Sequence, residues 1–220
     1  MKTLLTFVLA CLCISGSATE DFFQSLTMDT YLKSFPSLVY EGHVDREQGT
    51  YLLNLVRDNP SINNIAEIGF NAGHSSEIFL LANLDVTVLS FDLGVHNSVQ
   101  IAKKHIDDVY SGRHSLILGN SLVTVPHFHK ANRNQKFDLI FIDGGHTYEV
   151  AIGDIINMKA LAHENTILVM DDLVPQFPHG VGPTKAWEEA KNKGIIRVVE
   201  EVTSTNGRKK WGKAVYNFNH

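Results

Sequence analysis

Three aspartates and one histidine stand where apolar runs end, and their types suit metal binding and proton transfer. Asp143 closes one apolar run, and His146 follows three residues later. Asp171 and Asp172 close the next apolar run along the chain. In open α/β sheets the carboxyl ends of the strands face a ligand crevice, and neighbouring strands lie about 4.8 Å apart. We therefore expect these four side chains to converge at one edge of a sheet.

Clustered carboxylates repel one another unless a cation neutralises them, and a set of oxygen ligands suits a hard ion such as Mg²⁺. The sequence thus predicts a metal site made by Asp143, Asp171 and Asp172. His146 can take up a proton near neutral pH and is the candidate general base. Two simpler alternatives stay open: adjacent aspartates often cap a turn, and His146 could start a helix and hydrogen-bond only the backbone.

A turn that contains two glycines forms a second candidate site. The segment Glu67-Ile-Gly69-Phe-Asn71-Ala-Gly73-His-Ser75 follows one expected strand and opens a helix. Glycines let the backbone turn sharply and approach a ligand, and the start of a helix offers N–H groups. Glu67 could reach a cationic group of that ligand. The dinucleotide fingerprint has three glycines, so a pyrophosphate cradle is the weaker interpretation, and a plain βα turn with a surface glutamate is the alternative.

Two further strand ends could complete the site. Asp92 lies about 20 residues after the glycine turn, where an acid can accept hydrogen bonds from ribose hydroxyls, although such a residue also caps turns. Asn120 and Ser121 follow the next strand and could contact an adenine, with Ser121 as a helix N-cap the alternative. Trp187 could wall the pocket, but we expect it to pack its helix on the sheet.

Alternating strands and helices are needed to hold these residues. The alternation favours an α/β fold: a single Rossmann-like, doubly wound sheet with helices on both faces. We expect seven strands, mostly parallel, with an antiparallel C-terminal edge strand, because the turn signal Asn206-Gly207 separates the last two apolar runs. A loop at 176–183 and a helix at 184–191 precede those runs. The strands are expected at 64–69, 86–92, 115–118, 137–143, 166–170, 195–202 and 213–218, and the earlier helices at 46–57, 75–82, 98–110, 122–129 and 148–161.

The composition bounds the size and the partners of the protein. The 220 residues fit one domain with its own core, expected at 19–220. A net charge of -5 provides no basic surface for nucleic acid, so we expect no nucleic-acid partner.

The N-terminal segment 1–18 has the layout of a secretory signal. Lys2 precedes the apolar stretch 4–14, and small residues follow up to Ala18, the expected cleavage point. This predicts the secretory pathway or the extracellular space, with an uncleaved apolar helix as the alternative. Both cysteines lie inside the segment, and no second stretch is long enough to span a membrane after cleavage.

Together these segments resemble the S-adenosylmethionine-dependent methyltransferases of the Rossmann-like type. They are most similar to the metal-dependent small-molecule O-methyltransferases of the methyltransferase-24 family, over about 41–218, although Asn120 stands where that family frequently has an aspartate. The resemblance implies a divalent cation, Mg²⁺ above all, on Asp143, Asp171 and Asp172, with His146 as the base. It implies that S-adenosylmethionine is bound by Glu67, Gly69, Asn71, Gly73, Ser75, Asp92, Asn120, Ser121 and Asp143.

The implied reaction moves a methyl group from S-adenosylmethionine to a hydroxyl of a small molecule of catechol, sugar or polyketide type. A secreted S-adenosylmethionine-binding protein without catalysis is the alternative, but it has no need of Asp143, His146 and Asp172 together. A nicotinamide-dependent oxidoreductase would need the three-glycine fingerprint. The sequence does not identify the acceptor or decide the oligomeric state, and a homodimer is one option.

Overall fold

A single seven-stranded sheet runs through the described part of the computed structural model, which comprises residues 22–38, 40 and 44–218. The expected signal segment 1–18 lies outside these residues. Within them, no helix combines the length and the apolar character needed to cross a membrane. The strands are β1 (Asn64–Ile68), β2 (Thr87–Asp92), β3 (His114–Leu118), β4 (Phe137–Ile142), β5 (Ala162–Met170), β6 (Ile196–Thr203) and β7 (Lys210–Tyr216). The helices are α2 (Met28–Lys33), α3 (Arg46–Arg57), α4 (His74–Ala82), α5 (Asn97–Val109), α6 (Ser121–Ala131), α7 (Tyr148–Lys159) and α8 (Pro178–Asn192).

The strand order is β3-β2-β1-β4-β5-β7-β6, and the first five strands of the chain run parallel. This confirms the predicted α/β fold with its mostly parallel sheet. Helix α8 carries the chain from β5 to β6, and β7 then returns between them, antiparallel to both. The predicted antiparallel pair is present, but the expectation that the C-terminal strand forms the edge is wrong: β6 is the edge strand, and β7 lies between it and β5.

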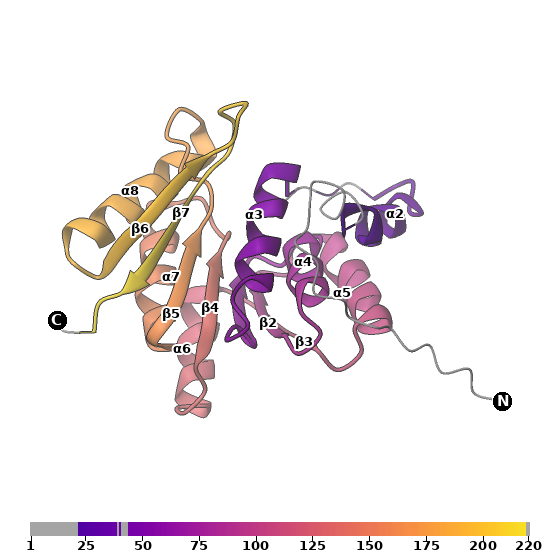
Figure 1. The fold of residues 1–220 in the computed structure, drawn as a ribbon, viewed down its shortest axis with the longest axis horizontal. Helices are drawn as coiled ribbons and strands as arrows, with labels where there is room; N and C mark the ends of the chain where they lie inside the picture. Colours follow the sequence, from indigo (N-terminus) through magenta and orange to yellow (C-terminus); the bar gives the residue numbers. More distant parts are fainter. Residues whose placement is uncertain (1–21, 39, 41–43, 219–220) are drawn as a thin grey trace.

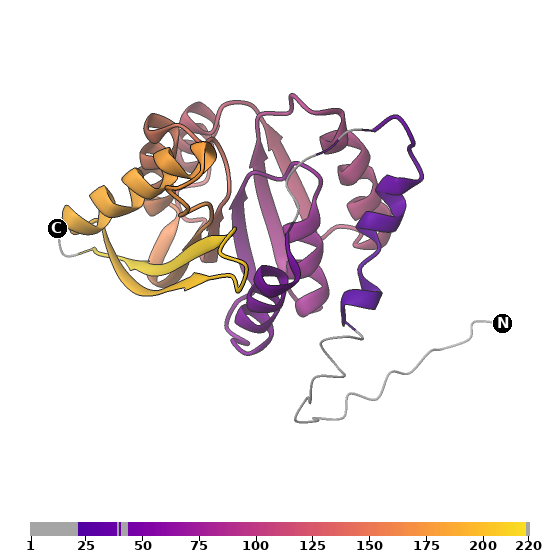
Figure 2. The same cartoon turned by 90° about the horizontal axis from the view of Figure 1, so that it is seen from above.

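Helices cover both faces of the sheet (Figures 1 and 2). The apolar sides of α3, α4 and α5 pack on one face, with α2 packed against α4 and α5, and those of α6, α7 and α8 pack on the other face. Successive strand residues point to opposite faces, so Leu139 and Phe141 of β4 belong to the first core and Ile140 and Ile142 to the second. A strand buried on both sides explains why the β4 sequence is almost continuously apolar.

Helix α8 begins six residues before the predicted helix, so the expected loop 176–183 is correct only at 176–177. Pro178 is the first helical residue, where a missing N–H costs little. Gly180 and Gly182 serve close packing, because a Cβ at either position would lie 2.2 Å from a backbone oxygen, that of Val174 or of His146. The glycines that resembled loop signals therefore let α8 pack against the segment that carries His146.

Trp187 of α8 lies in the core, as expected. Its side chain is fully buried, and its Nε1 donates a hydrogen bond of 2.9 Å to Glu201 Oε1. Trp187 therefore holds α8 on the sheet and does not wall the pocket.

Candidate active site

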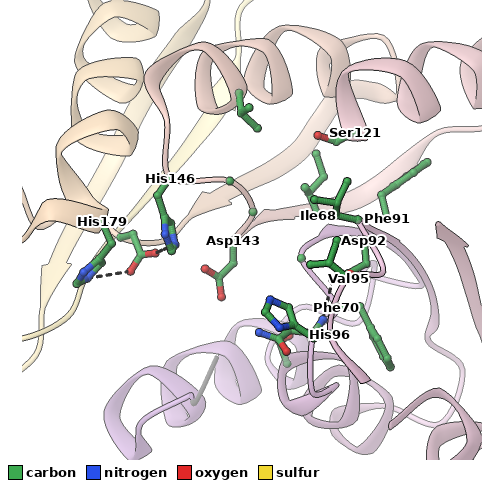
Figure 3. A pocket seen from close by; sticks show the side chains of 18 of the residues that line it. Ile68, Phe70, Phe91, Asp92, Val95, His96, Ser121, Asp143, His146 and His179 are labelled. Carbon is green, nitrogen blue, oxygen red and sulfur yellow. Dashed lines mark hydrogen bonds and ion pairs between the residues drawn. The ribbon is translucent and has the colours of Figure 1, made fainter. Parts of the chain in front are cut away.

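A cavity of about 760 Å³ opens at the carboxyl ends of the parallel strands. Figure 3 shows Asp143 in its middle, with His146 and His179 on one side and Asp92, Val95 and Ser121 on the other. Nine of the predicted site residues line it: Gly69, Asn71, Ser75, Asp92, Asn120, Ser121, Asp143, His146 and Asp172. Three predicted residues do not line it: Glu67, Gly73 and Asp171.

The glycine loop between β1 and α4 is held by a backbone contact and a carboxylate. Gly69 has a φ of +95°, and a Cβ there would lie 1.8 Å from the carbonyl oxygen of Asp143. Asn71 takes a positive φ of 43°, and its N–H donates a 2.8 Å hydrogen bond to Asp92 Oδ2. The other oxygen of Asp92 accepts from the Gly94 N–H at 2.7 Å, so the turn-capping alternative for Asp92 is present as well. Asp92 thus fixes the loop while it lines the cavity.

Glu67 lies behind the glycine loop. It is fully buried, so the alternative of a surface glutamate is wrong, and its carboxylate does not reach the cavity. The hydroxyls of Ser75, Ser76 and Ser90 donate to it, the last two at 2.5 and 2.6 Å. Burial raises the pKa of Glu67, and these three hydrogen bonds oppose that rise. The glutamate therefore ties β1, β2 and the start of α4 together and supports the loop from below.

The end of β3 delivers Asn120 and Ser121 to the cavity. Asn120 is the N-cap of α6, because its side chain accepts a 3.0 Å hydrogen bond from the Leu122 N–H. The alternative of Ser121 as N-cap is wrong, since Ser121 is the first residue of the helix. A capping Asn120 leaves the Ser121 side chain on the cavity wall (Figure 3).

The three aspartates converge, as the strand ends predicted. The Asp143 N–H donates to Ile68 O at 2.9 Å, and the Asp171 N–H donates to Ile142 O at 3.0 Å, so the strand register continues into the loops. One oxygen from each of Asp143, Asp171 and Asp172 lies within 4.8 Å of the others. Burial raises the pKa of Asp143 well above its usual range, and the charges of the other two aspartates add to the rise. Three carboxylates so close fit a divalent cation by their chemistry.

Two histidines flank Asp172. His146 Nε2 lies 3.0 Å from Asp172 Oδ2, and His179 Nε2 lies 3.8 Å from Oδ1 (Figure 3). Although burial acts to raise the pKa of Asp172, the hydrogen bond and charge of His146 hold it below its usual value. Asp172 also has a positive φ of 61°, a strained conformation that tends to occur at functional sites. The alternative in which His146 contacts only the backbone is wrong.

Sequence reasoning missed three residues at this site. His179 lay in the predicted loop that turned out to be helical. Lys209, in the turn between β6 and β7, lines the cavity and places its Nζ 3.1 Å from Asp171 Oδ2. Asp154 of α7 lies beneath the loop that follows β4. A Cβ added to Gly144, in that loop, would lie 3.4 Å from Asp154 Oδ2. The lysine has no local signal, because 38 residues separate it from its partner.

Comparison with known proteins identifies the domain that carries this site. Residues 66–173 match the methyltransferase-24 family, described as a methyltransferase domain. Residues 66–173 therefore form a methyltransferase domain of this family, and the protein is an S-adenosylmethionine-dependent methyltransferase. The match covers the glycine loop, Asp92, Asn120-Ser121 and the acidic cluster. No curated protein sequence matches this methyltransferase.

Solved structures share the fold of this methyltransferase at low sequence identity. An O-methyltransferase from Bacillus cereus in complex with S-adenosylhomocysteine has a TM-score of 0.68 and 18% identity, with 94% of each chain covered. The O-methyltransferase TomG from Streptomyces achromogenes, involved in tomaymycin synthesis and bound to S-adenosylmethionine, has a TM-score of 0.69 and 18% identity over 91% of this chain and 96% of that one. A methyltransferase from Podospora anserina bound to S-adenosylhomocysteine has a TM-score of 0.70 and 15% identity over 95% and 100%.

We expect Gly69→Ala to lower the free energy of unfolding by more than about 1 kcal/mol, because the methyl group meets a backbone oxygen at a left-handed φ. Gly112→Ala is the matched control, since Gly112 has a φ of +77° but nothing within 4 Å of an added Cβ. Urea unfolding of both variants measures the difference. Equal losses would show that the Asp143 contact imposes no constraint.

Asp154 predicts a pH dependence of stability. Burial raises its pKa from the ordinary 3.8 to about 7, with Ser121 opposing the shift. The folded state then holds a proton that the unfolded chain has lost, so Asp154 makes stability fall as pH rises from about 4 to about 7 and stay level above that. Asp154→Asn should flatten this fall in urea unfolding measured across that range. An unchanged slope in Asp154→Asn, compared with the exposed-site control Asp108→Asn, would contradict the assignment.

Proposed function

We propose that this methyltransferase transfers the methyl group to a hydroxyl oxygen of a small molecule and depends on a divalent cation. The observation that carries the proposal is one continuous cavity, lined at one end by the glycine loop and Asp92, in its middle by Asp143, and at the other end by Asp172 and His146. A cofactor site and a site for deprotonating an acceptor thus share one wall. The alternative function, a binding protein without catalysis, would not need the part of the cavity that contains Asp143, Asp172 and His146.

The end of the cavity near Asp92 suits the cofactor. Asp92 already accepts N–H groups from Asn71 and Gly94, but a carboxylate has about four acceptor positions and can still receive ribose hydroxyls. Ser121 supplies a hydroxyl and Phe91 an apolar surface on the same wall. S-adenosylmethionine bound here would offer its sulfonium methyl group toward Asp143, in the middle of the cavity.

The other end suits the acceptor. Asp143, Asp171 and Asp172 would hold the cation, whose contribution would be to bind two vicinal oxygens of the acceptor and to make one hydroxyl more acidic. His146 would take the hydroxyl proton. Its Nε2 lies 3.0 Å from Asp172 Oδ2, which would orient the imidazole ring. The acceptor oxygen then forms a bond to the methyl carbon while the carbon–sulfur bond breaks, which leaves a methyl ether and S-adenosylhomocysteine.

Vicinal oxygens occur in catechols, sugars and polyketide-like molecules, and we propose one of these classes as the acceptor. TomG, which shares the fold, is an O-methyltransferase involved in tomaymycin synthesis, which supports a small-molecule acceptor.

The reaction can be tested with methyl-labelled S-adenosylmethionine and a panel of catechols and sugars, with and without a chelator. We expect label transfer that the chelator abolishes. Asp143→Asn and Asp172→Asn should lose it while cofactor binding survives, and His146→Ala should lower kcat by about 10²- to 10⁴-fold. Asp108→Asn, an exposed aspartate outside the cavity, is the control. Cofactor binding without S-adenosylhomocysteine formation from any acceptor would favour the binding protein, and loss of cofactor binding without any metal effect would exclude the proposed roles.

Entry into the secretory pathway belongs to the proposal and rests on the sequence of segment 1–18. Expression of the full chain in a secreting host, followed by N-terminal sequencing of the protein in the medium, tests it. We expect a chain that starts after Ala18. Retention of the intact N-terminus inside the cell would refute this part of the proposal.

A further inference from the structure

The acidic cluster already holds a cation that belongs to the chain. Lys209 Nζ lies 3.1 Å from Asp171 Oδ2, and Asp171 is almost completely buried. The oxygens of Asp143, Asp171 and Asp172 lie within 4.8 Å of one another, so the ammonium group faces the charge of all three. Lys209 therefore supplies the aspartate cluster with positive charge that a bound metal ion would otherwise supply.

The backbone of Lys209 is held in position by the turn between β6 and β7. Its N–H donates to Ser204 Oγ at 3.0 Å, and its carbonyl accepts from the Ser204 N–H at 2.9 Å. The next carbonyl, of Lys210, accepts from the Leu173 N–H at 2.8 Å, directly beside Asp172. With the backbone fixed on both sides, the flexible four-carbon stem is the part that can move.

Asp171 and Asp172 each have a partner beside both carboxylate oxygens. Asp171 Oδ1 accepts from the Asp172 N–H at 2.8 Å, and its Oδ2 faces Lys209. Asp172 has His146 at one oxygen and His179 at the other. A divalent cation bound to this cluster would lie close to the ammonium group, and like charges repel. Because Lys209 also lines the cavity, its side chain has space into which it can withdraw.

We propose that Lys209 is a tethered counter-cation that competes with a divalent cation for Asp171. Without metal it neutralises part of the cluster; when metal binds, its ammonium group leaves Asp171 for the cavity. This inference rests on the metal site in the proposed function and extends it, because it makes Lys209 a determinant of metal affinity. Lys209 is a positioning residue in this scheme and does not touch the reacting atoms.

Calorimetric titration with Mn²⁺ tests the competition, because this ion accepts the same oxygen ligands as Mg²⁺. Neither cofactor nor acceptor is added. We expect Lys209→Met to bind Mn²⁺ at least about tenfold more tightly than the unmodified chain, a change of about 1.4 kcal/mol. Lys209→Arg keeps the charge and should bind as the unmodified chain does. Lys210→Met is the matched control, because Lys210 pairs with Glu201 at 2.7 Å and not with the cluster. Equal or weaker binding by Lys209→Met would overturn the proposal.

A second measurement uses the unmodified chain and does not depend on the folding of a variant. An amine-reactive acylating reagent is applied with and without saturating Mn²⁺, and the modified lysines are quantified by mass spectrometry. The labelling of Lys209 should rise several-fold with Mn²⁺, since its ammonium group moves into the cavity, while that of Lys210 stays constant. Unchanged or reduced labelling of Lys209 in the metal-bound chain would refute the displacement.

The two proposals fail in different ways. Tighter Mn²⁺ binding by Lys209→Met, together with no methyl transfer to any acceptor, would support the role of Lys209 and refute the proposed reaction. Methyl transfer that resists the chelator, with no Mn²⁺ binding by either the unmodified chain or Lys209→Met, would overturn the metal site and the role of Lys209 together.

Discussion

The close approach of the Gly69 backbone to the carbonyl oxygen of Asp143 is the constraint on which the site depends. β1 and β4 are neighbouring parallel strands with Ile68 opposite Ile142, so the loops after them leave the sheet side by side. Both loops fit only because Gly69 has no Cβ, which would lie 1.8 Å from that oxygen. The contact brings the glycine loop against the first residue of the acidic cluster. Ligands bound at the two loops would therefore be neighbours.

Buried carboxyl groups are the second constraint on this fold, and they are stabilised in two ways. Glu67 is surrounded by three serine hydroxyls, which satisfy its oxygens without adding charge. The aspartate cluster instead receives cationic or ionisable groups from other elements: Lys209 from the β6–β7 turn, and His146 and His179 from the loop before α7 and from α8. Removing carboxylates from water is costly unless partners compensate, so the first arrangement suits a support and the second suits a site that exchanges protons or cations.

The strand ends were predictable because their signal is local. An apolar run that stops at an acidic residue predicts both a buried strand and a polar group at its carboxyl end, and parallel pairing brings such ends together. Asp92, Asp143 and Asp171 were placed on this basis. The start of α8 was not predictable, because Pro178, Gly180 and Gly182 are typical of loops until the packing against His146 is known. Glu67 was placed at the right strand end but given a surface or ligand-facing position, since three serines from separate segments determine its burial.

The sequence by itself determined the alternation of strands and helices, the glycine turn and the acidic residues at the strand ends, because hydrophobic periodicity and turn chemistry act over a few neighbouring residues. Only the tertiary structure decided what surrounds those residues. It placed β7 inside β6, brought His179 to Asp172, and set Lys209 against Asp171 across 38 residues of chain. Such contacts depend on strand order and on the path of the β6–β7 turn, and no local pattern encodes either one. The charge balance of the acidic cluster is therefore a property of the fold.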